Sequence, residues 1–476
     1  MNTRRVSAAV ASAGLSSFAL LYVPQPVLPQ LAAAYRLDPG SASLAIGVAT
    51  ASLAVAVLPL AWVAGRVGRR RVILWSVVVS ALIGLLLPLA PSFPALLVMR
   101  GVQGVAIAGF AGVAAAYLAD QVGTARLPGA VGAMIAGNSV GGMLGRLGAG
   151  FTAGPLGWHA ALVAVAGVSL VCVLFTVMTL PREAPGTPRP DPGEPDGPDP
   201  REPAAPERVT HELGARSGVA VGAGPSPAIG VGDLRQSESM DGPGTGRGEV
   251  PGDSRREVAG GARREMPDGP KHEMPGRPVV DGRRERLGWG LMGPFAVGTL
   301  ATGAFVALYN AAGFRLAAPP LSLTPAAASL VFLSYAMGTA SSAATGRMVN
   351  RLGRTPTLVT ALLATVVGTV LTAHSALPVV ALGFAVLTAG FFAAHAIANA
   401  WVTAAAPPHS RGRAAGVYTL CYYLGSGAGG TAGGIVYGHA GWTWLIALTS
   451  AWLLLAAIAV LVSRRHPPTL RAKPGT

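Results

Sequence analysis

The chain has 476 residues, of which 51% are hydrophobic and only 12% are charged, and its mean hydropathy is +0.49. A soluble globular protein carries roughly a quarter of charged residues, so this composition excludes an ordinary soluble domain. The net charge of +15 lies mostly in short turns between apolar runs, so we interpret it as membrane topology and expect no nucleic-acid partner.

Two sets of six apolar segments are each about long enough to cross a bilayer as a helix. The first set covers residues 7–32, 42–64, 72–90, 94–119, 129–152 and 158–180. The second set covers residues 289–314, 326–349, 356–373, 378–404, 414–437 and 442–463. The sequence therefore predicts an all-α polytopic membrane protein with 12 transmembrane helices in two six-helix bundles.

The segment between the two sets, residues 182–287, differs sharply in composition. It holds 19 of the 21 acidic residues and 16 of the 36 basic ones. Such a polar stretch cannot bury enough apolar surface to offset its ordering entropy, so we expect a long disordered linker, for which a regulatory role is an open alternative. The expected domains are a bundle at 1–181, the linker at 182–287, a second bundle at 288–463 and a tail at 464–476.

The basic residues outside the linker flank one side of the expected membrane helices. Only Arg36 and Arg315 lie in the opposite loops. The positive-inside rule then places both termini and the linker in the cytoplasm of a protein of the cell (inner or plasma) membrane. The N-terminal Arg-Arg before an apolar run is similar to a signal peptide, but we expect a retained first helix.

The two halves also share sequence features at a nearly constant offset. The motif LGW that ends at Trp158 matches AGW ending at Trp442, 284 positions later, and we match Tyr22 with Tyr309 at an offset of 287. The glycines at 132, 141, 145 and 150 match those at 416, 425, 429 and 434. Parallel repeats of this kind enclose a binding site near the middle of the membrane.

A basic turn R-x-G-R occurs at the same place in both halves, and this turn resembles the hallmark loop G-x-x-x-D-R-x-G-R-R of the major facilitator superfamily. The resemblance covers everything except the linker. It is supported by RGVQG from Arg100 and by the glycine-rich run from Gly137 to Arg146, which is similar to the family's antiporter element. Within the superfamily, the stretches LYVPQPVLP, GNSVGGMLGR, FFAAHAIANAW and CYYLGS are most similar to YnfM-type efflux permeases for drugs or sugars.

The resemblance implies the family fold, alternating access, and a conformational switch in the two basic turns. The residues that carry this switch are Arg66, Gly68, Arg69, Arg70, Gly346, Asn350, Arg351, Gly353 and Arg354. Gly65 and Asn350 replace the acidic residue of the family loop, so we expect Asp120 to pair instead with Arg66 or Arg70. Topological anchoring by the arginines is the simpler alternative.

Several polar residues inside the expected helices are candidates for a substrate or proton pathway. Arg100 and Arg146 are the most conspicuous, because a guanidinium inside a membrane is costly and is functional by default. The alternative is an arginine that bonds backbone carbonyls or extends to the surface. His395 and Asn399 share a helix face, at spacing i, i+4. The other candidates are Tyr22, Gln25, Asn138, Asn310, Tyr418 and Tyr422.

The glycines of the fifth expected helix have two interpretations. Gly137, Gly141, Gly142 and Gly145 let helices approach closely, which is a packing role. The resemblance to the antiporter element implies a hinge. Three prolines in the first helix also free backbone carbonyls that other donors must satisfy.

The sequence has no phosphate loop, no paired carboxylates and no metal-ligand spacing, so we expect neither enzyme activity nor a cofactor or metal. We expect a monomeric secondary transporter that exports a small molecule against proton entry. No Asp or Glu lies deep in a helix, which favours a neutral or anionic substrate. His395 is the candidate proton carrier, because imidazole titrates near physiological pH; packing against Phe391 or Phe392 with a hydrogen bond to Asn399 is its structural alternative. A facilitative carrier without ion coupling, and a transport-inactive sensor that signals through the linker, are the other functions.

Overall fold

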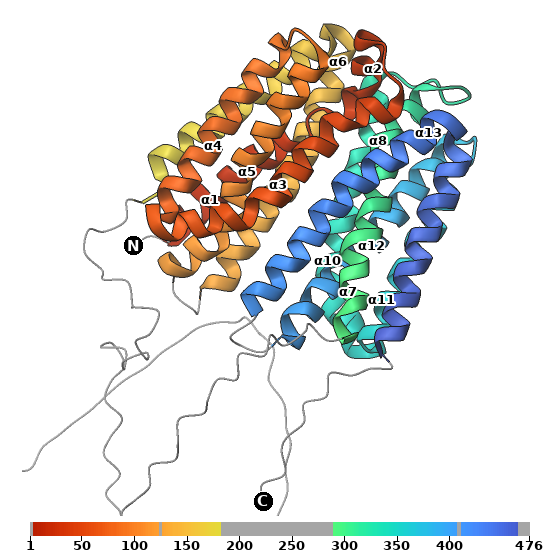
Figure 1. The fold of residues 1–476 in the computed structure, drawn as a ribbon. Helices are drawn as coiled ribbons and strands as arrows, with labels where there is room; N and C mark the ends of the chain where they lie inside the picture. Colours follow the sequence, from red (N-terminus) through yellow and green to blue (C-terminus); the bar gives the residue numbers. More distant parts are fainter. Residues whose placement is uncertain (1–2, 123–125, 182–288, 407–410, 465–476) are drawn as a thin grey trace, which may run out of the picture. The chain divides into compact units, whose positions relative to one another are not determined.

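The computed structural model describes residues 3–122, 126–181, 289–406 and 411–464, and all secondary structure in these ranges is helical. Figure 1 shows two bundles, the first coloured red to yellow and the second green to blue. The first half contains α1 (Thr3–Tyr22), η1 (Gln25–Val27), α2 (Leu28–Tyr35), α3 (Pro39–Val67), α4 (Arg69–Leu86), η2 (Leu87–Leu89), α5 (Phe93–Val122) and α6 (Leu127–Thr179).

The second half contains a similar series after the central segment. Its elements are η3 (Trp289–Leu291), α7 (Met292–Ala296), the π-helical η4 (Val297–Ala301), α8 (Thr302–Ala317), α9 (Pro325–Ser329), η5 (Leu330–Leu333), α10 (Ser334–Leu352), α11 (Arg354–Leu371), α12 (Leu377–Ala405) and α13 (Arg411–Arg464). The linker and tail expected from the sequence lie outside the described residues.

The two longest helices, α6 and α13, are each two membrane spans joined at a glycine. Gly157 has φ 78° and Gly441 has φ 82°, a region that favours glycine because it has no Cβ. These glycines are the centres of the LGW and AGW motifs. Ten helical stretches of the described chain are long and apolar enough to cross a membrane. Dividing α6 and α13 makes twelve, six in each half, so the predicted all-α membrane fold is confirmed.

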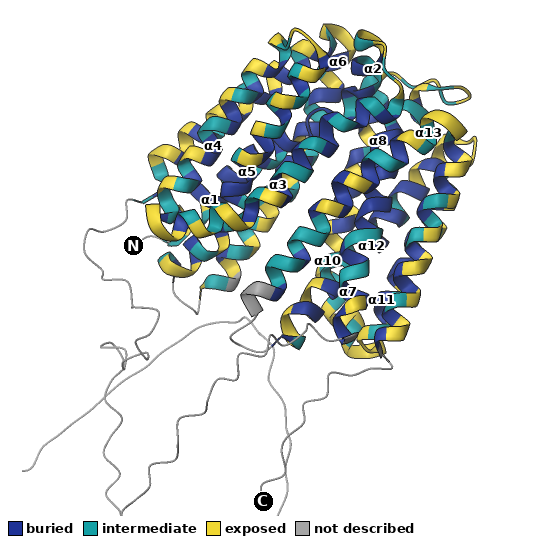
Figure 2. Cartoon of the chain, viewed as in Figure 1, coloured by how far each residue is buried: buried dark blue, intermediate teal, exposed yellow. Residues whose placement is uncertain are grey.

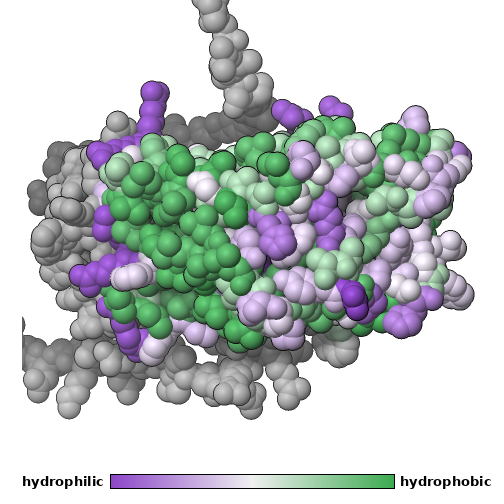
Figure 3. All heavy atoms as spheres, turned by 90° about the horizontal axis from the view of Figure 1, so that it is seen from above, coloured by the Kyte–Doolittle hydropathy of each residue, from purple (hydrophilic) through white to green (hydrophobic). Residues whose placement is uncertain are grey.

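The outer surface of the bundles is apolar, as lipid contact requires. Exposed residues lie on the outer sides of the helices and buried ones between them (Figure 2). Trp75 is 68% exposed and Leu89 74% exposed, which fits a side chain in hydrocarbon rather than in water. Seen from above, hydrophobic side chains cover a broad continuous area on the left of the view (Figure 3).

Chain direction gives the helices two ends, which we name for reference. The terminal end is where α1 begins and α13 finishes, and the far end holds Asp38, Gly157 and Gly441. At the far end Asp38 caps α3, accepting hydrogen bonds from the hydroxyl and amide of Ser41 and from the amide of Gly40. These bonds, the Ser41 hydroxyl foremost, hold the pKa of Asp38 below its ordinary value of 3.8.

Close glycine contacts give the register of the repeat. In the first half Gly141 and Gly145 of α6 pack on the backbone of Leu15 and Ala19 in α1. In the second half Gly425 and Gly429 of α13 pack in the same way on Thr299 and Gly303. The offset is 284 at all four positions. Our match of Tyr22 with Tyr309 was therefore wrong by three residues, because helical register is fixed by these contacts.

The two halves meet tightly at the far end. A Cβ atom on Gly150 of α6 would lie 2.1 Å from the Cβ of Ser329 in α9, and one on Gly40 of α3 would lie 2.7 Å from Ile435 in α13. Toward the terminal end, Gly132 of α6 and Gly346 of α10 have no neighbour within 4 Å on that side. In this conformation α6 therefore meets the second half mainly through α9 and η5, at the far end, and through Tyr335 of α10 beside Arg146.

Candidate functional site

A cavity of about 90 Å³ lies between the two halves, and six aromatic side chains line much of it. Five of the pathway candidates from the sequence line it: Tyr22, Gln25, Asn138, Arg146 and Tyr422. The remaining lining residues are Phe18, Ser139, Gly142, Phe305, Val306, Tyr335 and Phe392.

Arg146 is the charged group of this cavity, and it is only 2% exposed. Its Nε donates to Oε1 of Gln25 at 2.5 Å, and its Nη1 donates to the carbonyl oxygen of Gly142 at 2.8 Å. The guanidinium carbon lies 4.0 Å from the ring centre of Tyr22 and 4.7 Å from that of Tyr335. Aromatic faces attract a cation, so rings from both halves hold the charge in place.

Gln25 connects Arg146 to the second half. Its Nε2 donates to Oδ1 of Asn310 in α8 at 2.8 Å. Gln25 is 1% exposed and Asn310 is fully buried, and the Nδ2 of Asn310 has no hydrogen-bond partner among the described residues. The same is true of Oδ1 of Asn138. Unpaired buried polar groups are unusual and commonly mark a functional or hydrated place.

Arg100, the other membrane arginine, has a different environment. It is completely buried and lies outside the cavity lining. It donates to the carbonyls of Leu20 at 3.0 Å and Leu21, and to that of Ala45 at 2.7 Å. The carbonyl of Leu20 would ordinarily accept from residue 24, which is Pro24 and has no N–H. Arg100 thus satisfies carbonyls where α1 ends, as the alternative interpretation from the sequence described.

His395 lies one layer behind the cavity wall, on α12. The hydroxyl of Tyr418 in α13 is 2.9 Å from His395 Nδ1, and the imidazole lies 4.8 Å from the ring of Tyr422 and 6.0 Å from that of Phe391. The partner of the imidazole is therefore Tyr418 rather than Asn399, whose side chain is exposed one helical turn closer to the terminal end.

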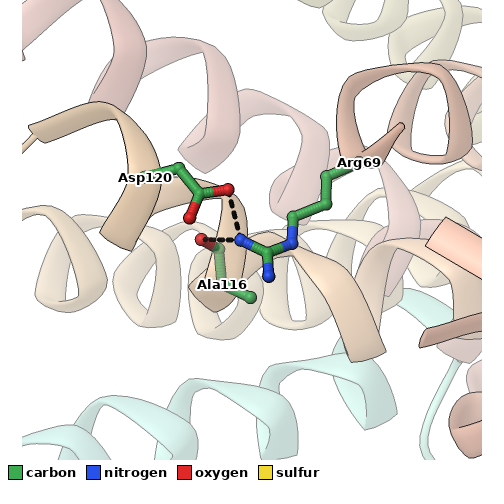
Figure 4. Close-up of polar contacts among 3 residues, drawn as sticks. All are labelled: Arg69, Ala116 and Asp120. Atoms are coloured by element: carbon green, nitrogen blue, oxygen red, sulfur yellow. Dashed lines mark hydrogen bonds and ion pairs between the residues drawn. The ribbon is translucent and has the colours of Figure 1, made fainter. Parts of the chain in front are cut away.

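In the first basic turn, the acidic partner differs from our expectation. Asp120 of α5 pairs with Arg69, not with Arg66 or Arg70, and Arg69 also donates to the carbonyl of Ala116 at 3.1 Å (Figure 4). Arg66 instead lies over the ring of Trp62, 3.4 Å from its centre, and Arg70 donates to the carbonyl of Leu180. Gly68, at φ 107°, joins α3 to α4 and directs the next residue toward α5.

The second basic turn has the same backbone but another partner. Gly353 has φ 84°, and Arg354 lies 4.1 Å from the ring centre of Trp401 in α12. The side chains of Asn350 and Arg351 are exposed. Each turn therefore ties its arginine to a helix of its own half, by an ion pair in one and by an aromatic face in the other.

The candidate hinge glycines have two kinds of contact. Gly137, Gly141 and Gly145 face α1, where an added Cβ would lie 2.3, 2.2 and 2.7 Å from backbone atoms. Gly142 faces the cavity and gives its carbonyl to Arg146. The first three are packing positions in this conformation, as the small-residue interpretation predicted.

Sequence reasoning missed the aromatic wall of the cavity. Phe18, Phe305, Tyr335 and Phe392 line it, yet as apolar residues in apolar helices they carry no distinguishing signal. Tyr335 is the most informative of them, because it faces Arg146 from the opposite half.

Comparison with known proteins gives a consistent family. The profile of the Major Facilitator Superfamily matches residues 10–240 and 290–476. The uncharacterised MFS-type transporter YybF of Bacillus subtilis (strain 168) is 28% identical over 453 residues, covering 95% of this chain and 92% of the relative. The inner membrane transport protein YnfM of Escherichia coli (strain K12) is 28% identical over 471 residues, covering 98% and 92%.

Solved structures show the same fold at low sequence identity. A bacterial homologue of the human lysosomal transporter Spinster, in an inward-facing and occupied conformation, aligns with a TM-score of 0.66 at 14% identity, covering 97% of this chain and 96% of that one. The nucleoside transporter NupG aligns with a TM-score of 0.60 at 13% identity, covering 98% and 100%. These relatives are transporters rather than enzymes, and the chain belongs to the major facilitator superfamily of membrane transporters.

Proposed function

We propose that this membrane transporter exports a neutral or anionic small molecule by alternating access, in exchange for a proton. The observation that carries the proposal is the cavity between the two halves, whose charged group is Arg146. The described Asp residues, Asp38 and Asp120, lie at opposite ends of their helices. Because a cationic substrate would meet an unpaired guanidinium here, the site favours neutral or negatively charged molecules.

Alternating access is supported by the packing of the halves. The far end is closed by glycine contacts between α3 and α13 and between α6 and α9. If the termini are cytoplasmic, as the positive-inside rule predicts, then this conformation is closed toward the outside. Export requires that the same contacts open.

His395 is the proposed proton carrier. Arginine stays protonated at any useful pH, and His395 is the imidazole that lies beside a cavity-lining ring, that of Tyr422. Its hydrogen bond to Tyr418 joins α12 to α13. A proton on His395 would change a contact between two helices of the second half, next to the substrate.

The test is transport into sealed vesicles that contain the purified protein, with an imposed pH gradient and a panel of anionic, neutral and cationic compounds. His395→Gln keeps much of the size of the side chain but removes its titration. We expect gradient-driven transport to stop in this variant while passive exchange continues. Undiminished uphill transport by His395→Gln would place the proton elsewhere, and a facilitative carrier would be indifferent to the gradient from the start.

The sensor alternative needs a separate experiment. Replacing residues 182–287 by a short spacer should leave the flux of a transporter intact. A sensor that signals through this segment would lose its output instead.

A further inference from the structure

We propose that Arg146 binds a carboxylate group of the substrate, and that this carboxylate takes the place of Gln25 Oε1 on the guanidinium. The inference deepens the proposed function and rests on it, since it names the substrate as a small carboxylate with an apolar or aromatic body. Four properties of the cavity lead to it.

The charge of Arg146 has no anionic partner among the described residues. Its contacts are a neutral amide, a backbone carbonyl and aromatic rings, and it is 2% exposed. A buried charge without a counter-charge is expensive, by several kcal/mol for an ion in a protein interior. An ionisable residue inside a membrane is by default a candidate for contact with a ligand, and of the two buried arginines Arg146 is the one that lines the cavity. A bound anion would supply the missing counter-charge.

The donors of Arg146 are arranged so that one edge can accept a carboxylate. A guanidinium has five N–H donors in a planar fork, and a carboxylate takes two parallel ones. Nε is bonded to Gln25 and Nη1 to the carbonyl of Gly142, whereas Nη2 makes no hydrogen bond to the described residues. The edge formed by Nε and Nη2 is therefore half free. A carboxylate that binds there must displace Oε1 of Gln25.

Displacement of Gln25 would change a hydrogen-bonded contact between the two halves. The side-chain amide of Gln25 bonds Arg146 at one end and Asn310 of α8 at the other. Once its Oε1 is released from Arg146, the bridge from α6 to α8 through Gln25 is broken. Substrate binding would thus loosen a connection that this conformation has near the far end, where α1 gives way to η1.

The rest of the cavity indicates what the carboxylate is attached to. Rings of Phe18, Phe305, Phe392 and Tyr422 surround the space next to Arg146, and its volume of about 90 Å³ suits a small body. Aromatic rings pack well against apolar and aromatic groups. A small aliphatic or aromatic acid matches the chemistry of both parts of the site, whereas an amine would be repelled by Arg146.

The test uses the purified full chain and measures binding of benzoate, with the uncharged benzamide as its matched control, by thermal shift and by tryptophan fluorescence. Gln25→Glu places a carboxylate on the chain beside Arg146. We expect this variant to have a higher Tm than the parent without ligand, and its benzoate affinity to fall at least tenfold. Gln25→Met removes the competing oxygen, so benzoate affinity should rise about threefold to tenfold.

The control variant is Arg315→Gln, which removes an arginine that donates to the carbonyl of His374 and lies outside the cavity lining; it should bind benzoate as the parent does. Equal binding of benzoate and benzamide by the parent, or unchanged benzoate affinity in Gln25→Glu, would overturn the proposal. If vesicles transport a neutral compound and benzoate neither binds nor competes, the carboxylate site is refuted and the transport proposal stands. If benzoate binds as expected but no gradient drives its movement, the transport proposal fails and the site stands.

Discussion

Closure of the far end depends on the absence of a side chain at Gly150, which makes Gly150→Ala a sharp test of the conformational argument. The new Cβ would lie 2.1 Å from the Cβ of Ser329, 2.6 Å from its Oγ and 3.2 Å from the carbonyl oxygen of Pro325. Ser329 cannot easily turn away, since it is 1% exposed and its hydroxyl donates to the carbonyl of Ala326 at 2.7 Å. The clash is between α6 and α9, so it is relieved when the halves separate.

The magnitude follows from the cost of overpacking. An extra methyl group in a well-packed contact costs about 1–3 kcal/mol. If the closed far end bears this cost and the open one does not, the equilibrium moves toward the open conformation by about 5-fold to 150-fold. Gly148→Ala is the matched control, because Gly148 is on the same helix and an added Cβ there would make only an ordinary contact, 3.7 Å from Cγ2 of Val165. Both substitutions replace a glycine inside the helix, so their helix-propensity effects are similar, about 1 kcal/mol.

The assay is the distance distribution between two spin labels at the far end. Ser92 and Ser375 are exposed in far-end turns of the two halves and serve as labelling sites after change to Cys, with the free cysteines Cys172 and Cys421 replaced by Ser. Gly150→Ala should shift the distribution to longer distances, whereas Gly148→Ala should leave it as in the parent. Equal distributions in all three proteins would refute the reasoning.

Three further predictions concern the ends of the helices. Asp38→Ala should lower stability by about 1 kcal/mol at pH 7 through loss of the α3 cap, and Asp38→Ser should restore most of it in a thermal-denaturation measurement. Because the Ser41 hydroxyl holds the pKa of Asp38 below 3.8, the charged cap stabilises above this pH, and the penalty of Asp38→Ala should shrink as the pH falls below it. Asp120→Asn should cost less than about 1 kcal/mol and become neutral at high salt, because its ion pair is between side chains that are 36% and 52% exposed; a large penalty would mean that the pair has a conformational role. A phosphatase fused at Gly224 should be inactive and one fused after Pro39 active, and activity at Gly224 would contradict the cytoplasmic assignment of the linker.

The number and order of the membrane helices could be predicted from the sequence, because the lipid bilayer requires apolar segments of a minimum length. Apolar runs of membrane length and the one-sided placement of arginine give the spans without any knowledge of packing. Gly157 and Gly441 stood out in the sequence as the centres of a repeated motif, but their positive φ was not predicted. The register of the repeat was harder: Tyr22 and Tyr309 share a residue type, yet the close contacts of Gly141 and its counterpart show that they are not equivalent.

The two buried arginines show what the sequence could not separate. Arg100 and Arg146 have the same charge and similar depth, so composition treats them alike. Each donates to backbone carbonyls and to one glutamine side chain, Gln103 for Arg100 and Gln25 for Arg146. What separates them is that Arg146 lines the cavity and lies over the rings of Tyr22 and Tyr335, whereas Arg100 lies outside the cavity lining. Similarly, the sequence led us to expect Arg66 or Arg70 as the partner of Asp120, whereas the structure pairs Asp120 with Arg69, the residue that follows Gly68.

The two halves are related by the repeat, but the functional side chains of the site are not repeated. At the offset of 284, the counterpart of Arg146 is Gly430, which faces the unpaired amide nitrogen of Asn310. The first half therefore supplies the cation. The imidazole of His395 and its partner Tyr418 belong to the second half.

If the first half holds an anion and the second half takes up a proton, neither half contains both ligands. Coupling between them must then pass through groups that both sites contact. Tyr422 is one such group, because it lines the cavity and its ring lies 4.8 Å from His395. Gln25 adds a link between the two halves, since it joins Arg146 to Asn310 of α8. In such a transporter the two ligands are linked through the same interface that must open and close during transport. This interface is therefore the structural basis for a coupling free energy between the two ligands.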